Sequence, residues 1–205
     1  MNLEGIKFYD QSLSLYEDLA GELDFNLMFS RQGHFTLGHS TAAVSGLVTR
    51  AENNKALGVD SYFLDPLEIK KMLPEIDISD HPRFPVHGAL YHPPGGIIRH
   101  DAVVWAYARG AERKGAQIHQ LTEVQDILVE NGKVSSVVTN RGTVSCNTVI
   151  SVVAGWSSEV CKKVNVKLPF VTHPLQALVT QSYKPWLNHV VVRGTLHIYL
   201  SQTDR

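Results

Sequence analysis

The amino-acid sequence predicts a mixed fold of the α+β / α/β type, in which amphipathic helices alternate with short antiparallel strands. Two observations carry this prediction. Helical hydrophobic spacing recurs along the chain, and stretches rich in β-branched residues lie between the helical segments. Two of these stretches are joined by Asn131-Gly132, which is the signature of a type I′ hairpin. A chain of 205 residues suffices for one large domain or two small ones.

Composition argues against several classes of function. The chain is 43% apolar and 19% charged, its net charge is -1, and it contains no run of like charges. We therefore expect neither a nucleic acid nor an acidic membrane surface as a partner. Apolar runs such as 149–155 are far shorter than the roughly 20 residues that a membrane helix needs. Cys146 and Cys161 have no metal-ligand spacing, so we expect both to be free thiols in a reducing compartment. The sequence also shows no leader at Met1, and we therefore expect a cytoplasmic protein.

The histidines predict no metal site. None of the ten pairs with another at i, i+4 around an acid, as in helical zinc sites. His34 and His39 flank a strand-like stretch, but two exposed histidines of a hairpin explain this spacing equally well.

The N-terminal part of the chain predicts alternating helices and strands. Apolar residues recur at helical spacing over 6–19, and two short strands are expected over 25–38, around Gly33. Ser40 is a suitable N-cap for the next helix, which continues to Gly58.

A shorter helix is predicted over 67–73. Asp65 suits its cap and Pro66 its first helical position. Residues 76–85, rich in Asp, Pro and Ser, are predicted to form a loop.

The segment from Gly88 to Trp105 predicts a cofactor site. It places a glycine pair and the triplet Arg99-His100-Asp101 directly before an amphipathic helix. Glycines let a backbone approach a ligand, the helix N-terminus favours a phosphate, and Arg99 adds a forked positive charge. An alternative stays open, in which the segment is a turn and Asp101 is a favourable acid in the first turn of the helix.

Strands dominate the part of the chain beyond that helix, which ends at Gly115. We expect them at 117–119, 123–129, 133–139, 143–146 and 148–153, with an antiparallel three-stranded meander among them. The last is predicted to be buried and to run into the turn Ala154-Gly155-Trp156. Such a turn can lead to a ligand-facing helix, although a plain strand-to-helix turn needs the same residues. Further strands are expected over 169–180 and 190–200.

Four stretches of the chain resemble one family. They are GALYHPPGGIIRHDAVVWAYARGAERKGAQI, TEVQDILVENGKVSSVVTNRGTV with the VVAGWSS that follows, THPLQALVT and HIYLSQTDR. The chain resembles the beta subunit of heterotetrameric sarcosine oxidase, which belongs to the D-amino-acid-oxidase class of flavoproteins. The resemblance extends from Leu3 to Arg205.

The resemblance implies an FAD-binding flavoprotein of two discontinuous domains. Residues 1–87 would supply mainly substrate-domain elements with an N-terminal helix, 88–168 FAD-domain elements, and 169–205 substrate-domain strands. Family members begin with a βαβ unit that carries G-x-G-x-x-G, and they end with a segment that completes the flavin pocket. Neither the βαβ unit nor the C-terminal segment is found here, so we expect a fragment with exposed strand edges.

The resemblance also implies an activity. The family oxidises the C–N bond of sarcosine with a noncovalent FAD in the beta subunit, an FMN at the alpha–beta interface, and oxygen. Glycine and hydrogen peroxide are formed, with formaldehyde or methylenetetrahydrofolate. The implied partners are the alpha, gamma and delta subunits, and no catalytic residue is assigned.

His100 is the site residue that the resemblance identifies most clearly. In the family, FMN is bound covalently by the histidine of a basic-His-Asp triplet, which matches Arg99-His100-Asp101. A neighbouring carboxylate could hold the imidazole in the tautomer that attacks the flavin, while Arg99 and the helix N-terminus favour its phosphate.

Further site residues follow from the same resemblance. The adenosine of FAD would meet the backbone of Val124, and the pyrophosphate would lie near Ala154-Gly155-Trp156. Tyr199 matches a position that faces the substrate cavity. Val124 could equally be an ordinary strand residue, and Tyr199 could belong to a cross-strand aromatic pair.

Two other functions stay open. One is a related amine oxidase or dehydrogenase that acts on dimethylglycine, glycine or a D-amino acid. The other is a noncatalytic interaction protein, which the missing dinucleotide motif favours, whereas the triplet at His100 favours sarcosine oxidase.

Overall fold

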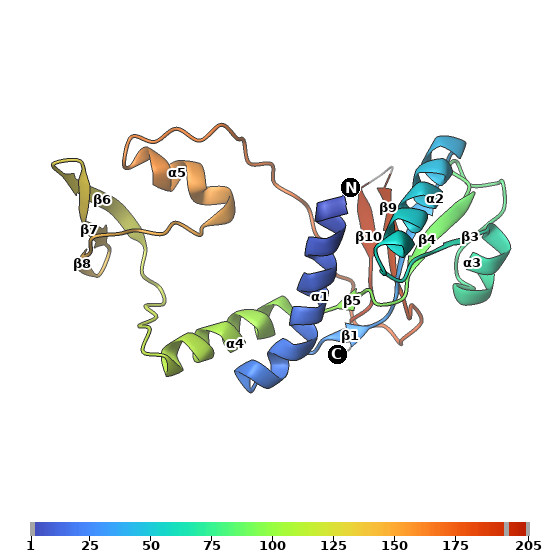
Figure 1. Ribbon diagram of the computed structural model, residues 1–205, viewed down its shortest axis with the longest axis horizontal. Helices are drawn as coiled ribbons and strands as arrows, with labels where there is room; N and C mark the ends of the chain where they lie inside the picture. Colours follow the sequence, from blue (N-terminus) through green and yellow to red (C-terminus); the bar gives the residue numbers. More distant parts are fainter. Residues whose placement is uncertain (1–2, 195–196, 204–205) are drawn as a thin grey trace. The chain divides into compact units, whose positions relative to one another are not determined.

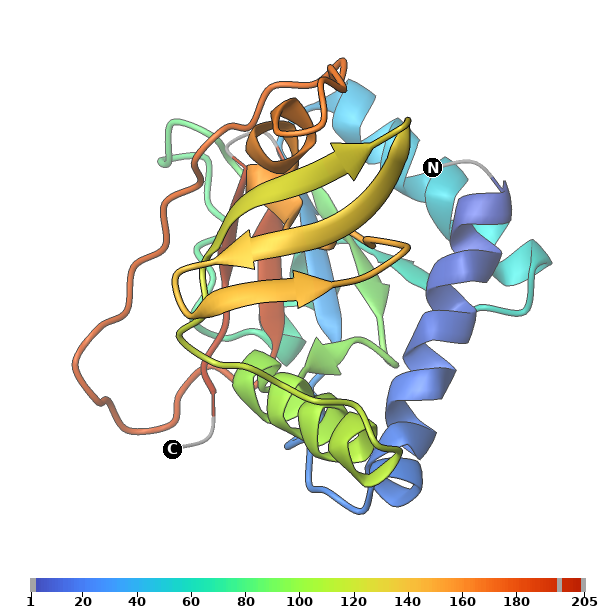
Figure 2. The same cartoon turned by 90° about the vertical axis from the view of Figure 1, so that its left-hand side faces the viewer.

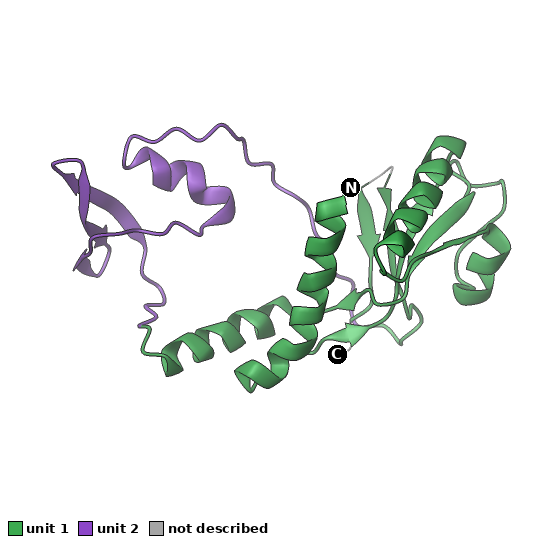
Figure 3. Ribbon diagram, viewed as in Figure 1, with its two compact units in different colours: residues 1–116, 183–205 green, residues 117–182 purple. Residues whose placement is uncertain are grey.

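The computed structural model describes residues 3–194 and 197–203. The chain divides into two compact units, one of residues 1–116 and 183–205 and the other of residues 117–182 (Figure 3). We call these unit 1 and unit 2. These boundaries differ from those of the predicted substrate and FAD domains, which were 1–87, 88–168 and 169–205. The domain assignment stays a prediction.

A five-stranded sheet forms the centre of unit 1 (Figure 1). Its strands, in the order in which they lie, are β10 (Ile198–Leu200), β9 (Val190–Arg193), β2 (His34–Gly38), β4 (Gly88–His92) and β3 (Tyr62–Leu64). β2 pairs antiparallel with β4 and parallel with β9, which brings together segments about 150 residues apart. A two-stranded sheet joins β1 (Ser30–Arg31) to β5 (Gly96–Ile97).

The helices predicted for unit 1 are present. They are α1 (Leu3–Leu23), α2 (Thr41–Ala56), α3 (Pro66–Met72) and α4 (His100–Arg113). The Ser40 hydroxyl accepts a hydrogen bond from the backbone N–H of Ala43, at 3.2 Å, and Asp65 forms a capping box with Glu68. Local capping chemistry therefore places both helix starts where the sequence predicts them.

Helices α2 and α3 cover opposite faces of the unit 1 sheet. Leu90 of β4 packs with Leu47 and Ala51 of α2, whereas its neighbour Ala89 lies in the core cluster that contains Ile69 of α3. Successive residues of a strand point to opposite faces, so the two helices lie on different sides. None of the helices that the structure describes is long and apolar enough to cross a membrane.

Unit 2 contains the predicted meander, which Figure 2 shows face on. β6 (Val124–Glu130), β7 (Lys133–Thr139) and β8 (Gly142–Ser145) pair antiparallel. Asn131 and Gly132 have φ angles of 52° and 76°, as a type I′ turn requires. A 3-10 turn over Ala154–Trp156 leads into the short helix α5 (Ser157–Lys162).

Three predicted strands are wrong. Residues 117–119, 148–153 and 169–180 are irregular, and Ile150 and Val152, expected to be buried, are 83% and 87% exposed. A strand forms only when a neighbour supplies hydrogen bonds, and no strand among the described residues pairs with these segments. Conversely, β3, β4 and β5 occupy segments for which the sequence predicted no strand.

Candidate functional site

The start of α4 is anchored to the core of unit 1. The backbone N–H of Arg99, the N-cap residue, donates to the carbonyl oxygen of Leu27 at 3.3 Å. The carbonyl of Arg99 accepts from the N–H of Val103 at 3.1 Å. Leu27 is buried and packs with Leu19 of α1 and Ala106 of α4. Residue 100 is therefore held on a fixed backbone at the beginning of a packed helix.

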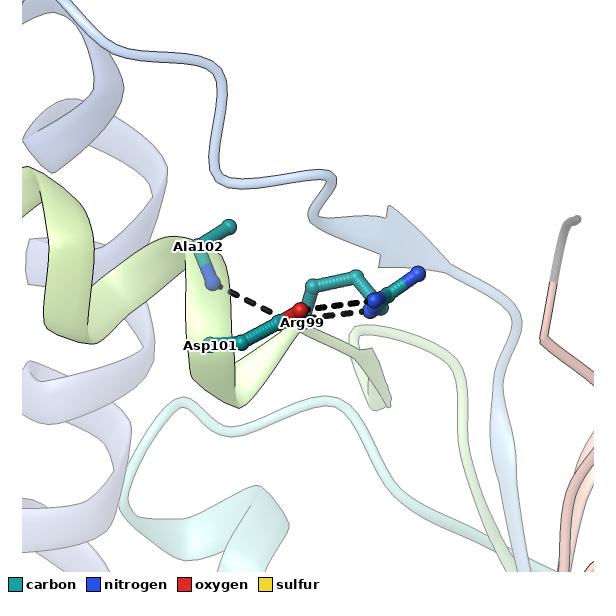
Figure 4. A network of polar contacts seen from close by, with 3 residues as sticks. All are labelled: Arg99, Asp101 and Ala102. Atoms are coloured by element: carbon teal, nitrogen blue, oxygen red, sulfur yellow. Dashed lines mark hydrogen bonds and ion pairs between the residues drawn. The ribbon is translucent and has the colours of Figure 1, made fainter.

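Arg99 and Asp101 form a forked ion pair, in which their side chains point toward each other (Figure 4). Arg99 Nε donates to Asp101 Oδ1 at 3.1 Å, and Arg99 Nη2 donates to Oδ2 at 2.7 Å. Oδ1 also accepts from the backbone N–H of Ala102, at 3.0 Å. One carboxylate thus binds both the guanidinium and the first turn of the helix.

The ion pair changes the protonation equilibria of both groups. The hydrogen bond from Arg99 is the main reason why the pKa of the Asp101 carboxyl lies below its usual value. The same bond raises the pKa of Arg99. Both charges are therefore present at neutral pH.

The imidazole of His100 is exposed and has no hydrogen bond or ion pair to any residue that the structure describes. The sequence suggested a carboxylate that could hold its imidazole, but Asp101 is turned toward Arg99 instead. Both ring nitrogens of His100 are consequently open to a ligand.

The glycine pair before α4 has a packing role within unit 1, and its expected place beside a ligand stays a prediction. A Cβ on Gly96 would lie 2.2 Å from the carbonyl oxygen of Ser30, and one on Gly95 would lie 2.6 Å from Cβ of His34. These glycines let the β5 segment approach β1 and β2.

The turn Ala154-Gly155-Trp156 lies beside an open pocket within unit 2, with a volume of about 540 Å³. The pocket is lined by Gly155, Trp156, Ser158, Glu159, Phe170, Val171 and Thr172. Thr172 Oγ1 donates to the carbonyl oxygen of Gly155 at 3.0 Å. A Cβ on Gly155 would lie 3.0 Å from Thr172 Cγ2, so the Thr172 side chain would have to shift slightly to admit one. Nothing in the sequence indicated Thr172, because the contact spans an irregular segment.

Val124 and Tyr199 both lie on strands. Val124 begins β6 opposite Thr139. Tyr199 lies in β10, is 69% exposed, and faces Val192 across the strand pair. Its cross-strand partner is therefore aliphatic, and the aromatic pair considered as an alternative does not form. Arg99, His100 and Tyr199 belong to unit 1, whereas Val124 and the 154–156 turn belong to unit 2.

The sequence pattern of the FAD dependent oxidoreductase family matches residues 2–205. The chain belongs to this family. It is 40% identical over 202 residues to sarcosine oxidase subunit beta of Arthrobacter sp., covering 98% of this chain and 50% of that protein. It is 41% identical over 198 residues to the subunit of the same name from Rhizobium meliloti (strain 1021), covering 97% and 47%. The chain thus spans about half the length of the curated relatives it matches.

A solved structure of similar fold is that of L-proline dehydrogenase from P. horikoshii. Its TM-score is 0.77 over 95% of this chain and 51% of that chain, at 24% identity. This likeness supports the fold alone. The fold class implied by the resemblance to FAD flavoproteins is thereby confirmed, as is the resemblance to sarcosine oxidase beta subunits.

Proposed function

We propose that this chain acts in the beta subunit of a heterotetrameric sarcosine oxidase. The observation that carries the proposal is the identity of 40% and 41% to two bacterial sarcosine oxidase beta subunits, over almost the whole chain. The reaction is the oxidative demethylation of sarcosine. It yields glycine and hydrogen peroxide, with formaldehyde or methylenetetrahydrofolate as the one-carbon product. The alpha, gamma and delta subunits complete the assembly, and we expect it in the cytoplasm.

A noncovalent FAD is proposed to contact unit 2. The backbone of Val124 would meet its adenosine, and Ala154-Gly155-Trp156 its pyrophosphate. The open pocket beside the turn, which Gly155 and Trp156 line, supports this placement. Tyr199 is exposed, and its hydroxyl would orient the amine or the carboxylate of the substrate.

FMN is proposed to be bound covalently by His100 at the alpha–beta interface. The free, exposed imidazole on an anchored helix start supports this role. Arg99 retains N–H donors beyond the two that Asp101 occupies, and the first turn of α4 supplies positive potential, so both favour the phosphate. When bound, the two flavins supply the redox chemistry, in which a hydride is taken from the amine and electrons pass to oxygen.

Anaerobic mixing with substrate tests the activity. The full-length protein, produced with its partner subunits, is expected to lose its yellow colour on addition of sarcosine and to respond more slowly to dimethylglycine. Bleaching by dimethylglycine alone would indicate the related dehydrogenase activity. No bleaching by either amine would contradict an amine oxidase of this kind.

Substitution of His100 tests the cofactor assignment. The His100→Ala assembly is expected to release all of its FMN when it is denatured with acid, whereas the wild type retains it on the beta subunit. His81→Ala is the matched control, because His81 is another exposed histidine of unit 1. Covalent FMN in the His100→Ala protein would show that another residue forms the bond.

A further inference from the structure

The charged residues on either side of His100 are bound to each other. Asp101 accepts two hydrogen bonds from the Arg99 guanidinium, at 3.1 and 2.7 Å, and a third from the N–H of Ala102. The carboxylate is therefore fixed at three points. Its orientation is set by Arg99 and by the first turn of the helix rather than by the imidazole between them.

In this arrangement no polar side chain of the neighbouring residues occupies the imidazole nitrogens of His100. An imidazole nitrogen that is to bond to carbon needs a free lone pair, which a donor such as a guanidinium would occupy. Asp101 holds the guanidinium of Arg99 in the fork, and the backbone of Arg99 is fixed by Leu27 and Val103. Asp101 thus determines where the guanidinium beside the imidazole of His100 lies.

We propose that Asp101 is a positioning residue for the attachment of flavin to His100, and that it acts through Arg99. The inference rests on the proposed function and deepens the role of the same site. In the attachment, one imidazole N–H and one methyl C–H of the flavin are replaced by an N–C bond. The two hydrogens, with their electron pair, pass to dioxygen, which leaves as hydrogen peroxide.

The ion pair is suited to positioning rather than to stabilisation. The side chains of Arg99 and Asp101 are 40% and 29% exposed, and ion pairs in contact with water contribute little to the stability of a protein. Loss of the Asp101 charge should therefore alter attachment much more than it alters unfolding. Asparagine keeps an oxygen for the N–H of Ala102, so Asp101→Asn removes the charge while it retains the helix contact.

The test measures the rate of covalent attachment. The full-length beta subunit, produced flavin-free with its partner subunits, is incubated with a series of FMN concentrations in air. Acid-stable flavin is followed over time, so that the maximal rate and the half-saturating FMN concentration are obtained separately. The variants are Asp101→Asn, Asp101→Glu, Arg99→Gln and the Arg99→Gln/Asp101→Asn double variant, and thermal unfolding of each is recorded.

We expect Asp101→Asn to lower the maximal rate about tenfold, as misplacement of a reacting group does, with an unchanged unfolding temperature. Asp101→Glu should restore most of the rate, because it restores the charge. The double variant should be no slower than Arg99→Gln, since the two residues act as one unit. Glu68→Gln is the matched control, because Glu68 is also a first-turn acid bound to backbone N–H, in α3, and it should keep the wild-type rate.

Four results would overturn the inference. A wild-type rate in Asp101→Asn would do so, as would losses that multiply in the double variant. If wild-type protein never forms acid-stable flavin, the covalent role of His100 and this inference fall together, whereas anaerobic bleaching by sarcosine still decides the proposed activity. If Asp101→Asn does not fold, Arg99→Gln and Asp101→Glu decide instead, because a wild-type rate in Arg99→Gln contradicts any action through Arg99.

Discussion

At the residue scale, Gly96 shows that a glycine in a pattern that suggests a ligand also serves the packing of two strands. The space that a side chain would occupy is filled by the carbonyl group of Ser30, which is part of the neighbouring strand. The local sequence does not predict this contact, because Ser30 and Gly96 are far apart along the chain. The triplet that follows is different, since its residues are adjacent, yet the sequence suggested that the carboxylate would hold His100 rather than Arg99.

Gly96→Ala is expected to lower the free energy of unfolding by about 1–3 kcal/mol, because β5 must move away from β1 to admit the methyl group. Gly46→Ala is the matched control: it lies in α2 with nothing within 4 Å, and alanine should stabilise the helix by about 0.5–1 kcal/mol. Urea unfolding of both variants measures the difference. Equal stability of the two would contradict the packing role of Gly96.

His34 gives unit 1 a pH dependence. Its burial, and then the nearby His92 and Arg50, lower the pKa of the folded-state imidazole below its usual value of 6.5. The unfolded chain therefore binds more protons in the window just below pH 6.5, and stability falls as the pH drops through that window. Unfolding measured between pH 7.5 and 5.5 should show this loss, and His34→Gln should reduce its slope. An unchanged slope in the variant would assign the loss to other groups.

At the scale of elements, the helix starts were predictable and the isolated strands were not. Ser40 and Asp65 cap their helices through contacts within three residues, and Asn131-Gly132 makes its turn alone. The strand predicted at 148–153 depended on a neighbour, and periodicity carries no information about whether one is present. Capping and turn chemistry are local, whereas sheet membership is decided by the rest of the fold.

Ser40→Ala is expected to cost about 1 kcal/mol of unfolding free energy, because the N–H of Ala43 loses its acceptor. Ser45→Ala, an exposed position within the same helix, should be neutral or slightly stabilising, since alanine has the higher helix propensity. The difference between the unfolding temperatures of the two variants measures the contribution of the Ser40 cap. Similar unfolding temperatures would mean that water replaces the hydroxyl.

At the scale of the whole molecule, the sequence predicted the family, the fold class and the meander of unit 2, but not which strands would be neighbours in the sheet of unit 1. The parallel pairing of β2 with β9 joins residues such as His34 and Val190, and no local signal encodes it. The resemblance succeeded because it draws on whole-chain similarity rather than on local chemistry. The contact of Thr172 with Gly155 was missed for the same reason as the parallel pairing.

A polypeptide of these 205 residues is expected to self-associate or to unfold without a sharp transition. Apolar side chains such as Ile150, Val152 and Leu178 are largely in water, and the outer strands β10 and β3 offer unpaired edges within the described sheet. Sedimentation and thermal unfolding test this expectation. A monodisperse monomer with one sharp, cooperative transition would contradict it.

The pairing of β2 with β9 also has a consequence during synthesis. All of unit 2 is translated between these two strands, so β2 lacks its parallel neighbour while about 150 residues are added. At about 5–20 residues per second, that interval lasts roughly 8–30 s. Throughout it the nascent chain exposes the ladder of β2 on one side, and chaperones that bind open strand edges have their longest opportunity there.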